Sequence, residues 1–324
     1  MSTLENITTI HRADLDRLNE RIHTRLQTSN SMMSKIVLSL LSSKGKQLRP
    51  LMLIMCARMF GPADDRVIAA AAAVELIHNA SLIHDDVVDN SMTRRGKPTV
   101  NAVWDNHIAV LVGDFFTSSA MQEAIFTDDI RIIDALCSLG RSLSLGEIEQ
   151  IYNAREHSLS VENYYRVIDY KTASLFVASA RMGCFATGAP AEALDALTDF
   201  ALLFGRCFQI RDDVFDYFPS DLVGKPTGND LREGKVSLPI LLALEKADEA
   251  QRKKVTEMLD RTSLSDEEIA YLQAFARDNG GIDMSFDVMY RLRDEAVAKL
   301  AGLPDADICR QLADLFDFII ARQF

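Results

Sequence analysis

The sequence is poor in the features that mark secreted, zinc-binding and membrane-spanning proteins. Its five cysteines in 324 residues are widely spaced and form no CxxC pair, which argues against a disulfide framework and a structural zinc site. The N-terminus lacks the apolar core of a signal peptide. No uncharged apolar run reaches the roughly 20 residues that span a bilayer. We therefore expect a cytoplasmic protein whose cysteines are buried, reduced thiols.

Basic residues are outnumbered by acidic ones. The sequence has 35 lysines and arginines against 47 aspartates and glutamates, a formal net charge of −12. Because an acidic surface repels polyphosphate chains and anionic lipids, we expect no nucleic-acid partner. Any anionic ligand must then be held by local basic clusters.

Strand patterning is absent as well, since no segment sustains apolar alternation at period two. Apolar residues recur at three- and four-residue spacing along nearly the whole chain, and most prolines fall between these stretches. One helix is predicted from about residue 65 into an aspartate cluster, and others near 100–123, 129–153, 161–187, 191–218, 237–259, 265–279, 282–301 and 304–321. No linker rich in glycine, serine or proline divides the chain. The sequence predicts a single all-α domain over residues 1–324, a multi-helix bundle with short loops.

Two aspartate-rich motifs lie within these apolar helices. The pattern DDxxD occurs as Asp85, Asp86 and Asp89 and again as Asp212, Asp213 and Asp216. On a helix the first and last aspartates of each motif share one face. Their carboxylates repel each other unless a hard cation intervenes, and Mg²⁺ usually binds one or two carboxylates together with substrate phosphates. Two such motifs facing each other across a bundle would hold several Mg²⁺ ions around one polyphosphate.

Basic residues lie beside these motifs and beside glycines. Arginine suits bidentate contacts with phosphate, and lysine acts as a point charge. The candidates are Lys46, Arg49, Arg94, Arg95, Lys171, Lys225 and Lys235. Each could also be a solvated surface charge, but their positions favour a phosphate site. The long, glycine-containing loop over residues 218–236 is predicted to be functional.

A series of motifs resembles, in the same order, those of the trans-polyprenyl diphosphate synthases. They are GKQLRP (residues 45–50), the first aspartate motif followed by RRG, VGDFF (112–116), GEIEQ (146–150), KTASLF (171–176), FQIRDDVFDY (208–217) and GKPTGNDLREGKVSLP (224–239). Ser237 stands in the last motif where the family usually has threonine. The resemblance covers essentially the whole chain and implies the isoprenoid-synthase type of bundle with a central active-site cavity.

The resemblance also implies a reaction and its residues. The enzyme would condense isopentenyl diphosphate with an allylic diphosphate by Mg²⁺-dependent ionisation, condensation and elimination. The implied metal ligands are Asp85, Asp89, Asp212 and Asp216. The implied catalytic residues are Asp85, Asp89, Lys171, Thr172, Gln209 and Asp212, with the oxygens of Thr172 and Gln209 directed at the carbocation. The implied substrate-binding residues are Lys46, Arg49, His78, Arg94, Arg95, Lys225 and Lys235. Members of the family are usually homodimers.

Small residues precede the first motif by one helical turn. Ala80 and Ser81 lie where short-chain members of the resembled family often carry aromatic residues. An isoprene unit is about as long as one helical turn of about 5.4 Å, so a bulky side chain there would stop growth early. With Ile77 on the same stripe, these residues predict a product longer than C20, of the kind used for quinone side chains. Such a product is insoluble in water, which predicts a transient membrane contact at release.

Several alternatives remain open. A short-chain farnesyl or geranylgeranyl synthase is one, with the floor of its cavity set by Phe115, Phe116 or Met121. In that case Ala80 and Ser81 only permit close helix packing. A terpene cyclase is disfavoured, because the second motif is DDxxD and the basic residues are present. The non-enzyme alternatives are a regulatory subunit of a heteromeric synthase and a simple metal-binding helical bundle.

Overall fold

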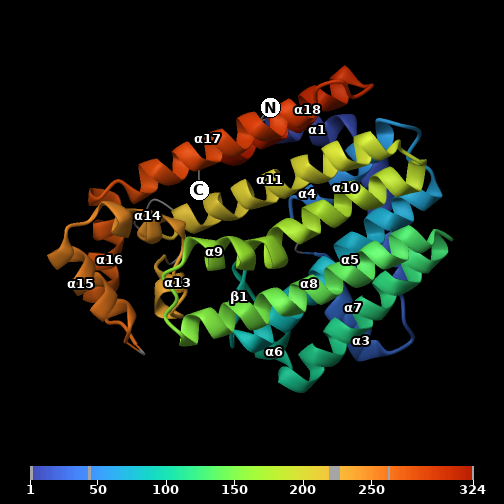
Figure 1. Ribbon diagram of the computed structural model, residues 1–324. Helices are drawn as coiled ribbons and strands as arrows, with labels where there is room; N and C mark the ends of the chain where they lie inside the picture. Colours follow the sequence, from blue (N-terminus) through green and yellow to red (C-terminus); the bar gives the residue numbers. More distant parts are fainter. Residues whose placement is uncertain (1–2, 43–44, 219–226, 262, 323–324) are drawn as a thin grey trace. The chain divides into compact units, whose positions relative to one another are not determined.

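The computed structural model describes residues 3–42, 45–218, 227–261 and 263–322, and helices dominate that part of the chain (Figure 1). The strands found there form one hairpin, in which β1 (Thr93–Arg94) pairs antiparallel with β2 (Lys97–Pro98). The all-α prediction is therefore confirmed. The hairpin itself was not predicted, because two residues a strand are too few to show alternation.

The contacts within the chain divide it into two compact units. The first comprises Met1–Arg141, Leu175–Thr198 and Gly302–Leu312, and the second comprises Ser142–Ser174, Asp199–Ala301 and Ala313–Phe324. Each unit is made of segments far apart in sequence. The single domain over residues 1–324 stays a prediction.

The first unit is built around one long apolar helix, α5 (Asp65–Val88). Asp64 caps this helix by accepting from the backbone N–H groups of Arg66 and Val67. Its alanine run, residues 69–73, has no exposed surface. Around α5 are α1 (Thr3–Ile10), α2 (Arg12–Arg25), α3 (Ser31–Leu41), α4 (Leu48–Arg58), the hairpin, α6 (Val100–Val103) and α7 (Asn106–Phe126). By length and composition α5 could cross a membrane, but it is largely buried and packs on α2, α4 and α7, which identifies it as a core helix (Figure 1).

The second unit carries the C-terminal helices and its own aromatic core. It contains α9 (Val161–Ile168), the π-helical turn η1 (Asp169–Ala173), α13 (Asn229–Arg232), α14 (Leu238–Lys246), α15 (Glu249–Leu259), α16 (Asp266–Asp278) and α17 (Gly281–Lys299). Helices α14, α16 and α17 pack on one another (Figure 1). The rings of Phe200, Phe204 and Phe316 lie 5.4–6.2 Å apart by their centroids. The helices α8 (Ile130–Arg155), α10 (Ser174–Thr187), α11 (Ala191–Phe215) and α18 (Ala306–Ala321) contribute residues to both units.

Three predicted helices are interrupted in the structure. The predicted helix over 100–123 breaks before α7, where Asp105 caps a new start by accepting from the N–H of Ile108. The one over 237–259 breaks between α14 and α15, where Asp248 and Gln251 form a capping box. The one over 161–187 contains the π-helical turn η1. Apolar periodicity continues through these breaks, so it could not reveal them.

Candidate active site

The first aspartate motif lies at the C-terminal end of α5, as predicted. Asp89 ends the helix as its C-cap, and its N–H donates to the carbonyl of Asp85. Both carboxylates are half-buried. The middle residue, Asp86, is buried and accepts from Nε of Arg94 at 2.9 Å. Burial raises the pKa of Asp86, and the guanidinium of Arg94 opposes that rise. Asp86 therefore holds Arg94, whereas Asp85 and Asp89 are one turn apart on another side of the helix.

The hairpin presents the arginine pair that follows this motif. Arg94 lies in β1, and the two-residue turn of Arg95 and Gly96 has φ values of 53° and 73°. Positive φ at both positions is typical of the type I′ hairpin turn. The guanidinium of Arg95 lies against Gly45, where an added Cβ would meet both terminal nitrogens at 2.9 Å. Two predicted motifs, GKQLRP and RRG, are thus brought together.

Several residues predicted to bind isopentenyl diphosphate lie in the first unit, where His78 is buried, Arg49 half-buried and Arg95 exposed. Arg49 lies with Cζ 5.0 Å from the ring centroid of Phe176. His78 is 9% exposed, and its Nδ1 is buried without a hydrogen-bond partner. Burial, followed by Arg49 and Arg95, lowers the pKa of His78 well below its usual value. His78 is therefore neutral at neutral pH and suited to hydrogen bonding rather than to charge pairing.

Glu75 completes this group and was missed by the sequence analysis. Burial raises the pKa of its carboxyl group, and the charges of Arg49 and Arg95 oppose the rise. Glu75 precedes His78 by one turn of α5, so the helical period could have flagged it. Lys46 is exposed on the segment that leads into α4.

The second aspartate motif belongs to the second unit. Asp212 has 40% of its side chain exposed and forms an ion pair with Arg322, just beyond α18. Helix α11 ends at Phe215, three residues earlier than predicted, so Asp216 lies in a turn. The carboxylate of Asp216 accepts from the backbone N–H groups of Asn229 and Asp230 at 3.3 and 3.1 Å. Asp216 thereby anchors the start of α13.

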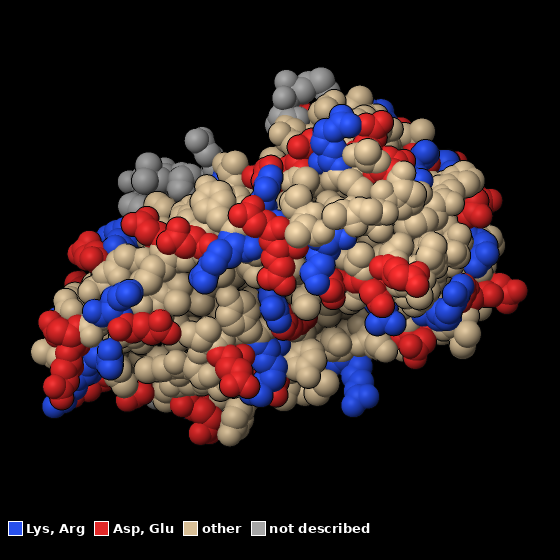
Figure 2. Space-filling model, turned by 45° about the horizontal axis from the view of Figure 1, so that its top comes forward, with Lys and Arg blue, Asp and Glu red and all other residues tan. Residues whose placement is uncertain are grey.

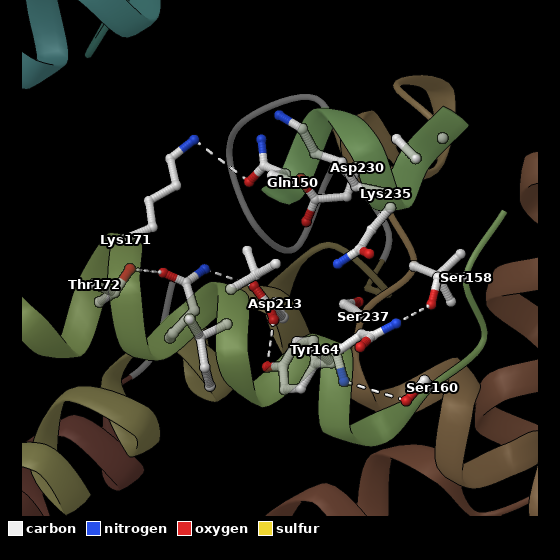
Figure 3. Close-up of a pocket in the computed structure, with 18 residues that line it drawn as sticks. Gln150, Ser158, Ser160, Tyr164, Lys171, Thr172, Asp213, Asp230, Lys235 and Ser237 are labelled. Carbon is white, nitrogen blue, oxygen red and sulfur yellow. Dashed lines mark hydrogen bonds between the residues drawn. The ribbon is translucent and has the colours of Figure 1, made fainter. Parts of the chain in front are cut away.

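Two of the predicted diphosphate-binding lysines converge on one glutamine. Lys171 forms an ion pair with Glu147, and Lys235 lies 2.6 Å from Glu233. Lys171 donates to the oxygen of Gln150 at 3.4 Å (Figure 3). With the amide of Gln150 turned to satisfy both lysines, its oxygen accepts from Lys171 at 3.3 Å and from Lys235 at 3.1 Å. Glu147 and Gln150 come from the GEIEQ motif, whose role the sequence did not reveal. Lys225 lies outside the described residues.

The π-helical turn η1 presents Lys171 and Thr172. It lies so close to α8 that a Cβ at Gly146 would be 2.9 Å from the backbone nitrogen of Lys171. Asp169 ties the same turn to α11 through two hydrogen bonds from Arg206, both 2.7 Å long. Close packing on one side and a bidentate ion pair on the other thus fix the turn that carries both predicted catalytic residues.

A chain of hydrogen bonds begins at Thr172 and runs along the wall of a cavity of about 240 Å³ in the second unit. Thr172 Oγ1 donates to Gln209 Oε1 at 2.6 Å, and Gln209 Nε2 donates to Asp213 at 2.7 Å. The hydroxyl of Tyr164 donates to the other oxygen of Asp213 at 2.6 Å (Figure 3). Burial raises the pKa of Asp213, and Asp230 adds to the rise, whereas the bonds from Tyr164 and Gln209 oppose it. Neither Tyr164 nor Asp213 was predicted to have a role of its own.

The predicted chain-length residues lie in the interior of the first unit. Ala80 and Ile77 are buried, and Ser81 is half-buried with its hydroxyl donating to the carbonyl of His78 at 2.9 Å. Ile77 faces α8, where a Cβ at Gly140 would lie 3.7 Å from its Cδ1.

The residues that would set a short-chain floor differ in burial. Met121 is 46% exposed in the chain, whereas Phe116 is 1% exposed. Phe115 is half-buried and packs edge-to-face on Phe116, with 6.5 Å between ring centroids. Phe116 is therefore the most deeply buried of the three.

The acidic residues fit Mg²⁺ held jointly with a substrate. In the described part of the chain, no group of three or more histidine, cysteine, aspartate or glutamate side chains could hold a metal ion by itself. The available donors are carboxylate oxygens, in particular those of Asp85, Asp89 and Asp212. One or two carboxylate ligands are enough for Mg²⁺, which completes its coordination shell with phosphate oxygens and water.

Known proteins resemble this chain over nearly its full length. A family model described as polyprenyl synthetase matches residues 30–275. The heptaprenyl diphosphate synthase component 2 of Geobacillus stearothermophilus is 34% identical over 313 residues, covering 96% of each protein. The structure of a decaprenyl diphosphate synthase from Rhodobacter capsulatus aligns with a TM-score of 0.92 and 32% identity, covering 99% of both chains. That of a geranylgeranyl pyrophosphate synthase from Bacteroides thetaiotaomicron aligns with a TM-score of 0.85 and 33% identity, again over 99% of both.

These likenesses cover both units and every motif identified in the sequence. The all-α architecture agrees with them. The chain therefore belongs to the polyprenyl synthetase family and is a prenyltransferase with the isoprenoid synthase fold.

Proposed function

We propose that the chain condenses isopentenyl diphosphate with an allylic diphosphate, repeatedly, to make a polyprenyl diphosphate longer than C20. The observation that carries this proposal is the convergence of Lys171 and Lys235 on Gln150, beside the oxygens of Thr172 and Gln209. Two cations there suit a departing diphosphate, and neutral oxygens next to them suit the carbocation left behind. The relatives named as heptaprenyl and decaprenyl synthases support a long product.

In this proposal the protein supplies charge and position. Lys171 and Lys235, together with Arg94 and Lys225, stabilise the negative charge that develops on the leaving diphosphate. Mg²⁺, bound through Asp85, Asp89, Asp212 and Asp216, supplies Lewis-acid stabilisation of the same charge. Because Asp216 already accepts from two backbone N–H groups at the start of α13, we assign it the weakest share of that binding.

The second substrate is assigned to the charge group in the first unit. Lys46, Arg49 and Arg95 would bind the diphosphate of isopentenyl diphosphate, and neutral His78 would donate a hydrogen bond to it. Glu75 would keep the two guanidiniums together before the substrate arrives. The double bond of isopentenyl diphosphate then attacks the carbocation, and the released diphosphate accepts the proton that is lost. Excluding water from the cation is the remaining task of the closed site.

The purified chain alone, supplied with farnesyl diphosphate, isopentenyl diphosphate and Mg²⁺, is expected to release diphosphate. Chelation of Mg²⁺ should abolish release, because the leaving group is then not stabilised. A phosphate-coupled assay measures both. One relative is named as component 2 of its synthase, so release that required a second protein would contradict self-sufficient activity. If no diphosphate is released under any condition, the remaining alternatives are a regulatory subunit and a simple metal-binding bundle.

We also propose that two copies of the chain associate through an exposed apolar stripe on α7. Leu111 and Ile125 are 63% and 62% exposed, and Met121 lies between them on the same side of the helix. Trp104 and Ile130 extend the stripe at its two ends. Large exposed apolar areas of this kind mark protein interfaces. Because members of the resembled family are usually homodimers, we propose that a second copy of the chain covers this stripe.

Replacing Leu111 with glutamate is expected to convert the dimer into a monomer. A charge buried in an apolar interface is strongly unfavourable. Sedimentation velocity measures the change, and Ser118→Glu, on the same helix face, should act in the same direction. The matched control is Asp134→Asn, an exposed position on α8, which should leave the dimer intact. A wild-type chain that sediments as a monomer would contradict the proposal.

We place the protein in the cytoplasm, since all five cysteines are free. Cys137 is exposed and Cys309 half-buried, so the expectation of uniformly buried thiols is wrong for these two. On the face shown in Figure 2, basic and acidic side chains are interspersed, which supports the absence of a nucleic-acid partner. A transient membrane contact at product release remains part of the proposal, because a long polyprenyl chain is insoluble in water.

A further inference from the structure

The amide of Gln209 has two ends of opposite polarity, and only one of them can stabilise a carbocation. The oxygen end attracts positive charge, whereas the NH₂ end repels it. The two ends have nearly the same shape, so packing alone cannot choose between them. A hydrogen-bonding neighbour of fixed polarity can.

Asp213 is such a neighbour. Its carboxylate is 5% exposed and accepts from Gln209 Nε2 through one oxygen and from Tyr164 through the other. Both oxygens of Asp213 act as acceptors in this arrangement, so the NH₂ end of the amide faces the carboxyl group. Tyr164 is 8% exposed, and burial together with Asp213 raises the pKa of its phenol well above the usual value. Tyr164 therefore remains a donor.

The far end of the amide then faces Thr172. Thr172 Oγ1 donates to Gln209 Oε1 at 2.6 Å, which closes a chain of hydrogen bonds with a single polarity. The chain joins three elements, α9, α11 and the π-helical turn η1, through residues that all belong to the second unit. Reversing the amide would break its bond to Asp213 and would place the NH₂ group instead of the oxygen on the side of Thr172.

We propose that Tyr164 and Asp213 are positioning residues that fix the amide of Gln209 with its oxygen toward Thr172 and the reacting carbocation. This inference rests on the proposed prenyl transfer. It gives the middle aspartate of the second motif a role that is distinct from metal binding. It also explains why α9 places a tyrosine hydroxyl beneath the motif.

The test is a polarity exchange between two side chains. In Asp213→Asn, Tyr164 donates to the oxygen of the new amide, so the NH₂ group of the asparagine faces Gln209. The amide of Gln209 then rotates to present its oxygen to the asparagine, and kcat should fall about 100-fold. In the double variant Gln209→Glu with Asp213→Asn, every bond is restored: Tyr164 donates to Asn, Asn donates to Glu, and Thr172 donates to Glu. Its kcat should recover to within about tenfold of wild type. KM for both substrates and the Mg²⁺ dependence should stay unchanged in both variants.

Removing the tyrosine hydroxyl provides a milder variant. Tyr164→Phe should lower kcat about tenfold, because Asp213 loses one of its two donors. The matched control is Tyr165→Phe, since that neighbouring ring packs against Arg206 outside the chain of bonds. The control should keep wild-type kcat.

Three outcomes would overturn the inference. Wild-type kcat in Asp213→Asn would show that the carboxylate of Asp213 is not needed to hold the amide of Gln209. A shifted Mg²⁺ dependence in that variant would show metal binding instead. A double variant that is no faster than Asp213→Asn alone would show that the side chains at positions 209 and 213 do not act together. Failure of the proposed function is distinguishable from failure of this inference. The thermal unfolding midpoint should fall in Asp213→Asn and recover in the double variant, and it is measured whether or not the chain turns over substrate.

Discussion

Replacing Asp85 with asparagine is expected to lower kcat by about 10³-fold with the fold intact. The substitution keeps the shape of the side chain and removes the charge that we propose binds Mg²⁺ at the end of α5. Losing one preorganised group that stabilises developing charge typically costs about 10²–10³-fold. Asp212→Asn should have a similar effect, and in both variants half-maximal rate should require more Mg²⁺. Steady-state rates over a Mg²⁺ titration measure both quantities.

The control is Asp134→Asn, which removes an exposed aspartate from α8 and should leave kcat unchanged. In the proposed mechanism the metal ions act together on one diphosphate, so the loss of rate in the double variant of Asp85 and Asp212 should be much smaller than the product of the two single losses. Either single variant keeping wild-type rate and Mg²⁺ dependence would remove that residue from the metal site.

The sequence was sufficient to locate the long helix and both aspartate motifs. Asp64 and the alanine run fix the start and the buried course of α5, and the motif ends it. These features depend on residues that are neighbours in the sequence, so they can be predicted from it directly. For the same reason the spacing of Asp85 and Asp89 was enough to place them one turn apart.

The roles of the middle aspartates could not be predicted in this way. Asp213 is defined by Tyr164, 49 positions earlier in the chain, and by the buried surroundings they share. Asp86 is defined by Arg94, which reaches it only because a hairpin of two-residue strands turns the chain back. The π-helical turn that presents Lys171 likewise depends on the close approach of Gly146. Each of these features is set by tertiary packing rather than by local preference.

Ser81→Phe is expected to shorten the product from beyond C20 to C15 or C20 while turnover continues. Ser81 lies one helical turn before Asp85, so a ring there would meet the growing chain about one isoprene unit from the metal site. Chemistry at the diphosphate is untouched, so diphosphate release from a short primer should persist. Chromatography of the dephosphorylated products measures the chain length.

Two substitutions separate bulk from other effects in this experiment. Ser81→Ala removes the hydrogen bond to the carbonyl of His78 but adds no volume, so the long product should remain. Leu82→Phe adds volume about 100° away around the helix and should also leave the length unchanged. If Ser81→Phe makes the wild-type product, the chain does not grow along this face of α5. If wild type itself stops at C15 or C20, Phe116 is the residue to test next, since Phe116→Ala would then lengthen the product.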